Sequence, residues 1–207
     1  MSTATVADIY DQGAKGYNQR HAGRQSRKYQ RIEASMRAQL RHGQVLDLGC
    51  GTGRLTPSKR GVGIDVSLEM LKQAPATLSR VCADGHHLPF ADGSFDTVIA
   101  AQGVIRYMQP AQFMPEVFRV LRPGGHFTAH QFGSVFSLRK LRRIKGELDI
   151  ESPSELTSPA EAAGFQTVEV ELWRPIKAYP FALRVPPWMP GQLWTHCVTH
   201  FEKPAGK

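Results

Sequence analysis

The fold is decided by Val45-Leu46-Asp47-Leu48-Gly49-Cys50-Gly51-Thr52-Gly53, an apolar run that breaks directly into a glycine loop. The three glycines let the main chain turn sharply off a strand, and they leave no side chain between the backbone and a ligand. The pattern differs from the G-x-G-x-x-G of dinucleotide-binding folds, because the third glycine comes one residue early and Arg54 follows it. A nicotinamide oxidoreductase is therefore disfavoured.

Asp47 indicates which kind of ligand the loop holds. A carboxylate two residues before the first glycine would repel a pyrophosphate, but it would attract the ammonium of an amino-acid-like ligand. The alternative role for Asp47 is structural, as a hydrogen-bond acceptor for loop amides. The first interpretation predicts a nucleoside-like ligand that carries no phosphate.

Four further segments follow the loop in order along the chain. Val62-Gly63-Ile64-Asp65 reads as a second strand ending in an acid, and such an acid can accept both hydroxyls of a ribose. Cys82-Ala83-Asp84-Gly85 follows a third apolar run, residues 95–101 read as a fourth strand, and residues 120–125 as the turn into a fifth. Each acid taken alone could equally be a solvated loop residue or a helix cap.

Together these five segments resemble the class I S-adenosylmethionine-dependent methyltransferases, and the Leu-Pro-Phe and Phe-Asp segments at 88–90 and 95–96 resemble the type 11 group of ubiquinone and menaquinone methyltransferases. The resemblance implies S-adenosyl-L-methionine as cofactor, with Asp65 at its ribose and Asp84 at its adenine amino group. Met70 lies where an apolar side chain flanks the adenine in this family, although core packing would explain it equally well. The resemblance implies these cofactor-binding residues: Tyr17, Asp47, Gly49, Cys50, Gly51, Gly53, Asp65, Val66, Met70, Asp84, Gly85, Ala101 and Gln102.

Two further regions take their expected roles from the same resemblance. Residues 10–17 resemble the family's opening helix with paired tyrosines, which folds over the cofactor, so Tyr17 is expected at the methionine end; the alternative is a frayed terminal helix. Residues after the fourth strand face the methyl group in this family, and here they are Gln102, Arg106 and Tyr107. None of these side-chain types is a strong base, so no catalytic residue is assigned. Ala100-Ala101-Gln102-Gly103 stands in place of Asn-Pro-Pro-Tyr, which disfavours exocyclic N-methylation of that type.

The resemblance therefore implies an enzyme that transfers a methyl group in line to an O, C or N atom of a small molecule or of a carrier- or lipid-linked one. The net charge of +8 concentrates in residues 20–31 and 139–145, which are most simply solvated faces. The alternative function is a methyltransferase-fold module with little or no activity that binds nucleic acid or an anionic membrane. Segment 174–195, rich in proline, is a candidate substrate-facing loop or an ordered surface crossover.

Alternating strand-like and helix-like patterns predict an α/β fold. The expected architecture is Rossmann-like and doubly wound: a mostly parallel seven-stranded sheet with an antiparallel last strand and helices on both faces. At 207 residues the chain is expected to form a single methyltransferase domain. Within it, residues 1–42 would form N-terminal cap helices, 43–133 the cofactor-binding half, and 134–207 a substrate-side half with closing antiparallel strands.

Periodicity and cap residues predict the individual helices. Apolar residues at 29, 32, 36 and 40 predict an amphipathic helix, and Ser67 predicts the start of another that runs to about Ala74 with Leu68 and Leu71 on one side. A third helix is expected from Phe113 to Leu121. Ser158-Pro159-Ala160-Glu161 is a capping-box pattern for a fourth, which Gly164 would close.

The remaining strands are predicted from turns and alternation. The fifth strand is expected from about His126, and a sixth from Phe165 with its glutamates 169 and 171 on a wet face. His196 to Glu202 would pair with it as the last strand. Only eleven residues separate Gly53 from Asp65, and Pro57 is among them, so the helix after the glycine loop should be very short or irregular.

Composition excludes several other classes of protein. The N-terminus lacks a signal-peptide pattern and no apolar run could span a bilayer, so a cytoplasmic location is expected. Cys50, Cys82 and Cys197 lack the spacing of a disulfide framework or zinc site, and reduced thiols are expected. The histidines at 86, 87, 126 and 130 lack partners at a metal-binding spacing, and no metal is assigned.

Overall fold

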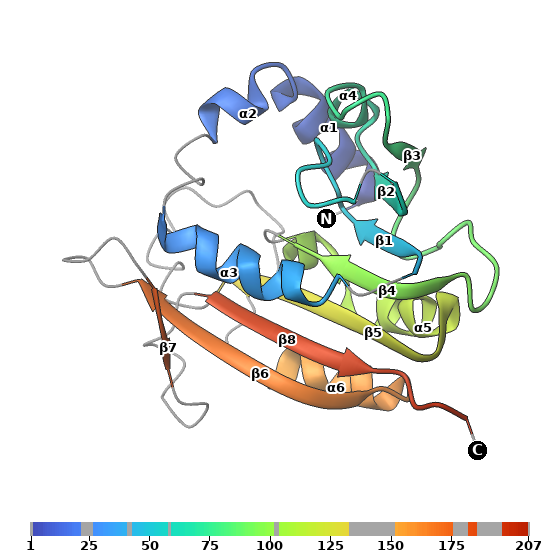
Figure 1. Cartoon of the computed structure of the whole chain (residues 1–207). Helices are drawn as coiled ribbons and strands as arrows, with labels where there is room; N and C mark the ends of the chain where they lie inside the picture. Colours follow the sequence, from blue (N-terminus) through green and yellow to red (C-terminus); the bar gives the residue numbers. More distant parts are fainter. Residues whose placement is uncertain are drawn as a thin grey trace.

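The strands of the chain form one mixed sheet (Figure 1). The structure is a computed structural model, which describes residues 2–21, 27–40, 43–57, 59–101, 104–132, 152–175, 182–185 and 196–206. The strands are β1 (Val45–Leu48), β2 (Gly61–Asp65), β3 (Ser79–Cys82), β4 (Phe95–Ala100), β5 (Leu121–Phe132), β6 (Gln166–Pro175), β7 (Ala182–Val185) and β8 (His196–Glu202). The helices are α1 (Thr3–Gly13), α2 (Tyr17–Arg20), α3 (Arg27–Ala38), α4 (Leu68–Lys72), the 3-10 turn η2 (Val104–Tyr107), α5 (Pro110–Val120) and α6 (Ser154–Ala162).

The sheet order is β3-β2-β1-β4-β5-β8-β6-β7. Strands β1 to β5 are parallel, whereas β8 pairs antiparallel with both β5 and β6, which confirms the predicted Rossmann-like sheet and its closing antiparallel strands. The short edge strand β7 adds an eighth strand to the seven expected, and it lies inside the proline-rich segment. The chain order reverses at β1, between β2 and β4, where open α/β sheets bind their ligands.

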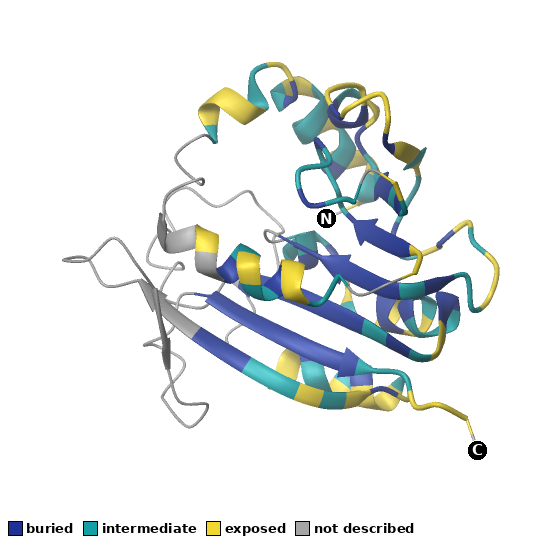
Figure 2. Cartoon of the chain, viewed as in Figure 1, coloured by how far each residue is buried: buried dark blue, intermediate teal, exposed yellow. Residues whose placement is uncertain are grey.

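Helices cover both faces of the sheet, and strands β1, β4 and β8 are almost completely buried, whereas β3 and part of β6 are exposed (Figure 2). On one face Phe113 of α5 and Phe165 pack with Phe127 and Phe201 of the sheet. On the other face Ile32 and Met36 of α3 pack on Leu55, Ile99, Ala101 and Val198, as the period of that helix predicts. None of the helices in the described part of the chain is long and apolar enough to cross a membrane.

Helix α4 begins at the predicted residue, but it ends earlier than predicted. The Ser67 hydroxyl accepts a hydrogen bond from the Met70 amide at 3.1 Å, which confirms the cap. The helix ends at Lys72, and Met70 and Leu71 are its buried residues. Leu68 is 50% exposed and Leu71 is buried, so the side of the helix on which the sequence places both residues is only partly buried. Little more than one turn of helix is present, and two residues supply its whole buried side.

Helix α6 begins a turn earlier than predicted. A second Ser-Pro-x-Glu sequence precedes Ser158, and there the Ser152 amide donates to Glu155 Oε1 at 2.8 Å. Pro159 therefore lies inside the helix. The earlier start buries Leu156 and Ala160, four residues apart, on one side of the helix. Gly164 follows the helix with φ +105°, as predicted.

Two irregularities in strand register account for the errors in the strand predictions. Strand β5 begins at Leu121 rather than about His126, because Leu121 already pairs with Phe95 before the register shifts. In β6 the register shifts between Thr167 and Glu169. A one-residue slip exchanges the two faces of a strand, and accordingly Val168 is 61% exposed while Glu171 is buried. The predicted wet face of glutamates is therefore wrong at Glu171.

Candidate functional site

A cavity of about 520 Å³ opens at the carboxyl ends of β1, β2 and β4, beside α1 and α2. This volume is within the usual range for small-molecule sites. Twelve of the thirteen residues predicted from the sequence line it: Tyr17, Asp47, Gly49, Cys50, Gly51, Gly53, Asp65, Val66, Met70, Asp84, Gly85 and Ala101. Gln102 lies outside the described residues. The structure thus brings together segments that are far apart in the sequence.

The glycine loop has the backbone conformation that its sequence predicts. Gly49, Gly51 and Gly53 have φ angles of +67°, +54° and +72°. These angles favour glycine. The loop is also crowded, since a Cβ on Gly53 would lie 2.6 Å from Leu78 Cδ2. The described residues between the loop and β2 form turns instead of a helix, which agrees with the short spacing from Gly53 to Asp65.

Asp65 ends β2 and joins it to the glycine loop. Its carboxylate accepts the Gly51 amide at 2.8 Å on one oxygen and the Ser67 amide at 2.9 Å on the other. Burial raises the pKa of the Asp65 carboxyl, although these backbone hydrogen bonds act in the opposite direction. A carboxylate offers about four lone-pair sites, so the Asp65 carboxylate can still accept from a hydroxyl of a ligand in the cavity.

Asp47 is a buried acid in the wall of the cavity. It is 2% exposed, and its Oδ2 accepts a 2.5 Å hydrogen bond from the Thr56 hydroxyl. Burial raises the pKa of Asp47 to about 7, and the negative charge of Asp65 adds to this effect. The hydrogen bond from Thr56 and the positive charge of Arg37 act against it. A cation in the cavity would favour the ionised carboxylate.

Asp84 lies at the far end of the site and is fixed by several donors. It accepts from the Thr3 hydroxyl at 2.5 Å, the His86 amide at 2.9 Å and His86 Nδ1 at 2.7 Å. Burial raises the pKa of Asp84, but these hydrogen bonds outweigh it and hold the pKa below its ordinary value. The other ring nitrogen of His86, Nε2, lies 3.0 Å from the Gln109 amide, so the ring is held between Asp84 and the start of α5.

The N-terminal helices contribute aromatic rings to the lining of the cavity. The Tyr17 ring lies 4.2 Å from that of His21 and 6.4 Å from that of Tyr10. The Tyr10 hydroxyl donates to the Tyr107 hydroxyl on η2 at 3.3 Å. Of the three residues expected near the methyl group, Tyr107 lines the cavity, Arg106 is not among the lining residues, and Gln102 is not described.

Several residues of the site were missed by the sequence analysis. Thr3, Asn18, His21 and His86 all line the cavity, as does Thr52, whose hydroxyl donates to Asn18 Oδ1 at 2.9 Å. Only Thr52 lies within a motif that could have drawn attention to it. The others are polar residues without a spacing signal, and only the fold brings them to the cavity.

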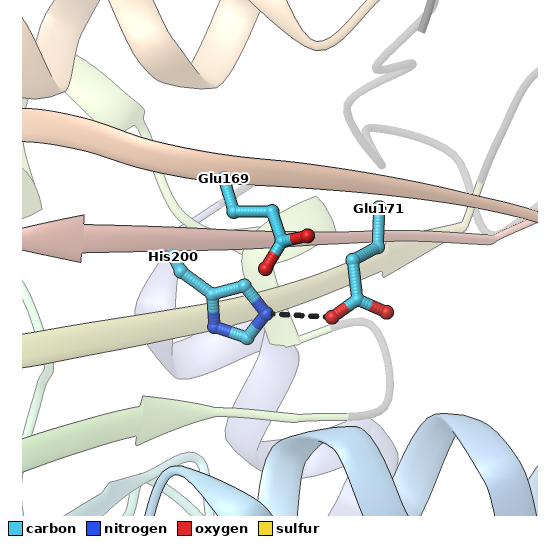
Figure 3. Close-up of side chains that lie close together, drawn as sticks. All are labelled: Glu169, Glu171 and His200. Atoms are coloured by element: carbon cyan, nitrogen blue, oxygen red, sulfur yellow. Dashed lines mark hydrogen bonds and ion pairs between the residues drawn. The ribbon is translucent and has the colours of Figure 1, made fainter. Parts of the chain in front are cut away.

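A second polar cluster lies on the sheet face beneath α3, away from the cavity. Glu169 and Glu171 project from β6 toward His200 of β8 (Figure 3). Each of the three side chains has an oxygen or nitrogen that could bind a metal ion, and these atoms lie within 4.8 Å of one another. His200 Nε2 lies 3.1 Å from Glu171 Oε1, which also accepts from the Ser35 hydroxyl at 2.7 Å. His200 Nδ1 lies 3.1 Å from Thr128 Oγ1. These hydrogen bonds give the cluster a structural role that joins α3, β5, β6 and β8.

Comparison with known proteins identifies a family. A family model described as "Methyltransferase domain" matches residues 46–129. A malonyl-[acyl-carrier protein] O-methyltransferase of Herminiimonas arsenicoxydans is 33% identical over 189 residues, covering 84% of this chain and 68% of that protein. A demethylmenaquinone methyltransferase of Corynebacterium kroppenstedtii is 39% identical over 97 residues, covering 44% of this chain and 42% of that protein. Other curated relatives are matched over about half of their own length.

Solved structures agree on the fold. A methyltransferase of Thermotoga maritima, described as a possible histamine N-methyltransferase, superposes with a TM-score of 0.77 at 19% identity, covering 95% of this chain and 99% of that one. The match to the first relative extends well beyond the glycine loop, and the three acids converge on one cavity. The chain therefore belongs to the S-adenosylmethionine-dependent methyltransferase family.

Proposed function

We propose that this protein binds S-adenosyl-L-methionine in the cavity and transfers its methyl group in line to an O, C or N atom of a small or carrier- or lipid-linked acceptor. The observation that supports this most directly is the convergence of Asp47, Asp65 and Asp84 on one cavity with the glycine loop. Three carboxylates fit a ligand that has an ammonium, a ribose and an exocyclic amine, and they would repel a pyrophosphate.

Each acid would hold one part of the cofactor. Asp47 would face the ammonium, Asp65 the ribose hydroxyls, and Asp84 the adenine amino group. Gly85 follows Asp84 and lines the same cavity, so its amide would lie beside the adenine. Met70 is 2% exposed and lines the same cavity, as an apolar contact for the base requires.

The remaining work of the chain would be to orient the reactants and exclude water. The cofactor supplies a methyl group on a positively charged sulfur. Tyr10, Tyr17 and Tyr107 line the cavity, where they would limit access of water to the reacting atoms. Correct orientation alone can supply roughly 7–11 kcal/mol of the barrier reduction. A base is needed only for an acceptor that must lose a proton.

The acceptor is proposed from the relatives, since segments 133–151, 176–181 and 186–195 lie outside the described residues. One relative is named for a carrier-linked acyl group and another for a quinone. We propose the same division of the chain as its sequence suggests, with residues 1–42 as a cap, 43–133 as the cofactor half and 134–207 as the acceptor half.

The decisive experiment has two steps. Mass spectrometry of small molecules released by heat from the purified protein would identify the cofactor or its demethylated product. Incubation with methyl-labelled S-adenosylmethionine and a metabolite extract would then show whether label is transferred. Binding without any labelled product, together with salt-sensitive binding to nucleic acid or anionic vesicles, would favour the non-catalytic alternative.

Asp65→Ala is expected to weaken S-adenosylmethionine binding by roughly 1.5–3 kcal/mol, because a charged acceptor for the ribose hydroxyls is lost. Isothermal titration calorimetry measures the change. Asp92→Ala is the matched control, since this acid is exposed and lies outside the cavity. Equal affinity of the Asp65 variant and the wild type would remove the ribose assignment.

Cofactor affinity is expected to rise as the pH increases through about 7, because the Asp47 carboxyl must ionise to hold an ammonium and burial raises its pKa to about 7. Above about pH 8 affinity should fall again as the ligand's own amino group loses its proton. In the ligand-free protein the same carboxyl makes folding stability change with pH in the opposite direction. Between the ordinary pKa of 3.8 and the folded value of about 7 the folded state holds the extra proton, so stability falls as the pH rises across this window.

Titration calorimetry from pH 5.5 to 9 and urea unfolding from pH 4 to 8 measure these two effects. Asp47→Asn is the control for both, because an amide does not titrate. It should abolish the rise in affinity near pH 7 and flatten the loss of stability. A wild-type affinity that is constant from pH 6 to 7.5 would contradict the assignment of Asp47 to the ammonium.

A further inference from the structure

Helix α1 is bonded near its start to one acid of the cavity and near its end to the residues that follow another. Near its start the Thr3 hydroxyl donates to Asp84 Oδ2 at 2.5 Å. Near its end Asp11 Oδ1 accepts from the Ser67 hydroxyl at 2.5 Å and from the Glu69 amide at 3.1 Å. Figure 1 shows α1 beside α4, where these bonds are made. The helix is therefore bonded to one acid directly and to the neighbourhood of another.

The bonds of Asp11 continue to Asp65 through one residue. Ser67 is fully buried, and its amide donates to Asp65 Oδ1 at 2.9 Å. Its hydroxyl gives its single proton to Asp11 and accepts the Met70 amide at 3.1 Å. Asp65 is held on its other oxygen by Gly51. A chain of hydrogen bonds thus runs from α1 through Ser67 and Asp65 to the glycine loop.

We propose that Asp11 is a positioning residue for cofactor binding, which fixes Ser67 and through it the carboxylate of Asp65. This proposal rests on the proposed function, because Asp65 is the expected ribose acceptor. Asp11 itself is absent from the residues that line the cavity, so it would act through Ser67 and not by contact with the ligand.

The geometry explains why an acceptor is needed at this position. A hydroxyl has one proton, and Asp11 directs that of Ser67 away from Asp65. Without Asp11 the hydroxyl would be free to rotate and donate elsewhere, and the Glu69 amide would lose its acceptor. The turn from Asp65 to Met70 would then be less ordered, and ordering it would reduce the free energy available for binding.

The negative charge of Asp11 has an opposing effect, because it disfavours the ionised form of Asp65. After burial, which is the largest cause, this charge is one of the effects that raise the pKa of Asp65. An asparagine at position 11 keeps an acceptor oxygen and removes the charge. The two contributions of Asp11 can therefore be separated by substitution.

The test compares S-adenosylmethionine affinity in Asp11→Ala, Asp11→Asn and Asp8→Ala by titration calorimetry. Asp11→Ala should bind about tenfold more weakly, as expected for loss of a hydrogen bond to a charged group. Asp11→Asn should stay within about twofold of the wild type, since its oxygen still accepts. Asp8→Ala is the matched control, because it removes the same charge from an exposed site on the same helix, and it should be unchanged.

A double-variant cycle separates positioning from a general effect on folding. In an Asp65→Ala background, Asp11→Ala should weaken binding by less than about twofold, since the carboxylate that it positions is already absent. Ser67→Ala breaks the same link from its other end, and it replaces Asp11→Ala if that variant does not fold. Unchanged affinity in Asp11→Ala, an equal loss in Asp11→Asn, or additive effects in the cycle would overturn the proposal. A wild type that fails to bind S-adenosylmethionine would instead overturn the proposed function.

Discussion

Gly49→Ala is expected to abolish measurable cofactor binding and to destabilise the fold. Gly49 has φ +67°, and a Cβ there would lie 2.1 Å from Val104 Cγ2 and 2.7 Å from Val104 Cβ. The left-handed backbone costs an alanine about 1–2 kcal/mol. Forcing extra atoms into a packed site costs about 1–3 kcal/mol more. Val104 begins η2, so relief of the clash would displace the turn that carries Tyr107 into the cavity.

Gly124→Ala is the matched control for this prediction. Gly124 has φ +75°, but, apart from its two chain neighbours, no atom of the described residues lies within 4 Å of the Cβ that would be added. It therefore tests the backbone cost without the clash. Urea unfolding measures the stability of both variants, and titration calorimetry their cofactor affinity. Gly49→Ala should be the less stable by about 1–3 kcal/mol, and it alone should lose binding. Equal effects of the two substitutions would show that contact with Val104 is unimportant.

The residues around the glycine loop could be placed in one site from the sequence because their signals are local. Gly49 directly follows β1, Asp65 ends β2 and Asp84 comes two residues after β3, and parallel strands place their carboxyl ends at the same edge of a sheet. A glycine loop also specifies its own backbone conformation. Asp47, Asp65 and Asp84 consequently line one cavity in the structure.

The contacts of the N-terminal helices could not be predicted in the same way. Thr3 and Asp84 are 81 residues apart, and Asp11 and Ser67 are 56 apart. A threonine or aspartate on an amphipathic helix has no pattern that names its partner, because packing of the whole helix decides it. Asp11 therefore reads in sequence as an ordinary surface acid.

The error at Glu171 has a different physical origin. Alternation predicts the faces of a strand only while the register is uninterrupted, and the shift after Thr167 reverses it. The capping-box error has a similar cause, since two equal Ser-Pro-x-Glu patterns occur and burial of Leu156 selects the first. In both cases tertiary packing decided between alternatives that the local sequence left open.

Glu171→Ala is expected to lower the free energy of unfolding by roughly 3–5 kcal/mol, because it breaks a buried pair and leaves its partners desolvated. Glu171 is 8% exposed and His200 6%. The carboxylate oxygen that is lost accepts from Ser35 of α3 and pairs with His200 of β8. Urea unfolding measures the change. Cofactor affinity should be unaffected at temperatures where the variant is folded, since neither residue lines the cavity.

Two comparisons show whether the loss comes from desolvated partners. Glu161→Ala removes the same group from an exposed position on α6, and it should change stability by no more than about 0.5 kcal/mol. The double variant Glu171→Leu/His200→Leu replaces both members of the pair with apolar side chains, and it should recover much of the stability that Glu171→Ala loses. A loss below about 1 kcal/mol for Glu171→Ala would mean that water reaches His200 and Ser35, and the cluster would then contribute little to holding α3 on the sheet.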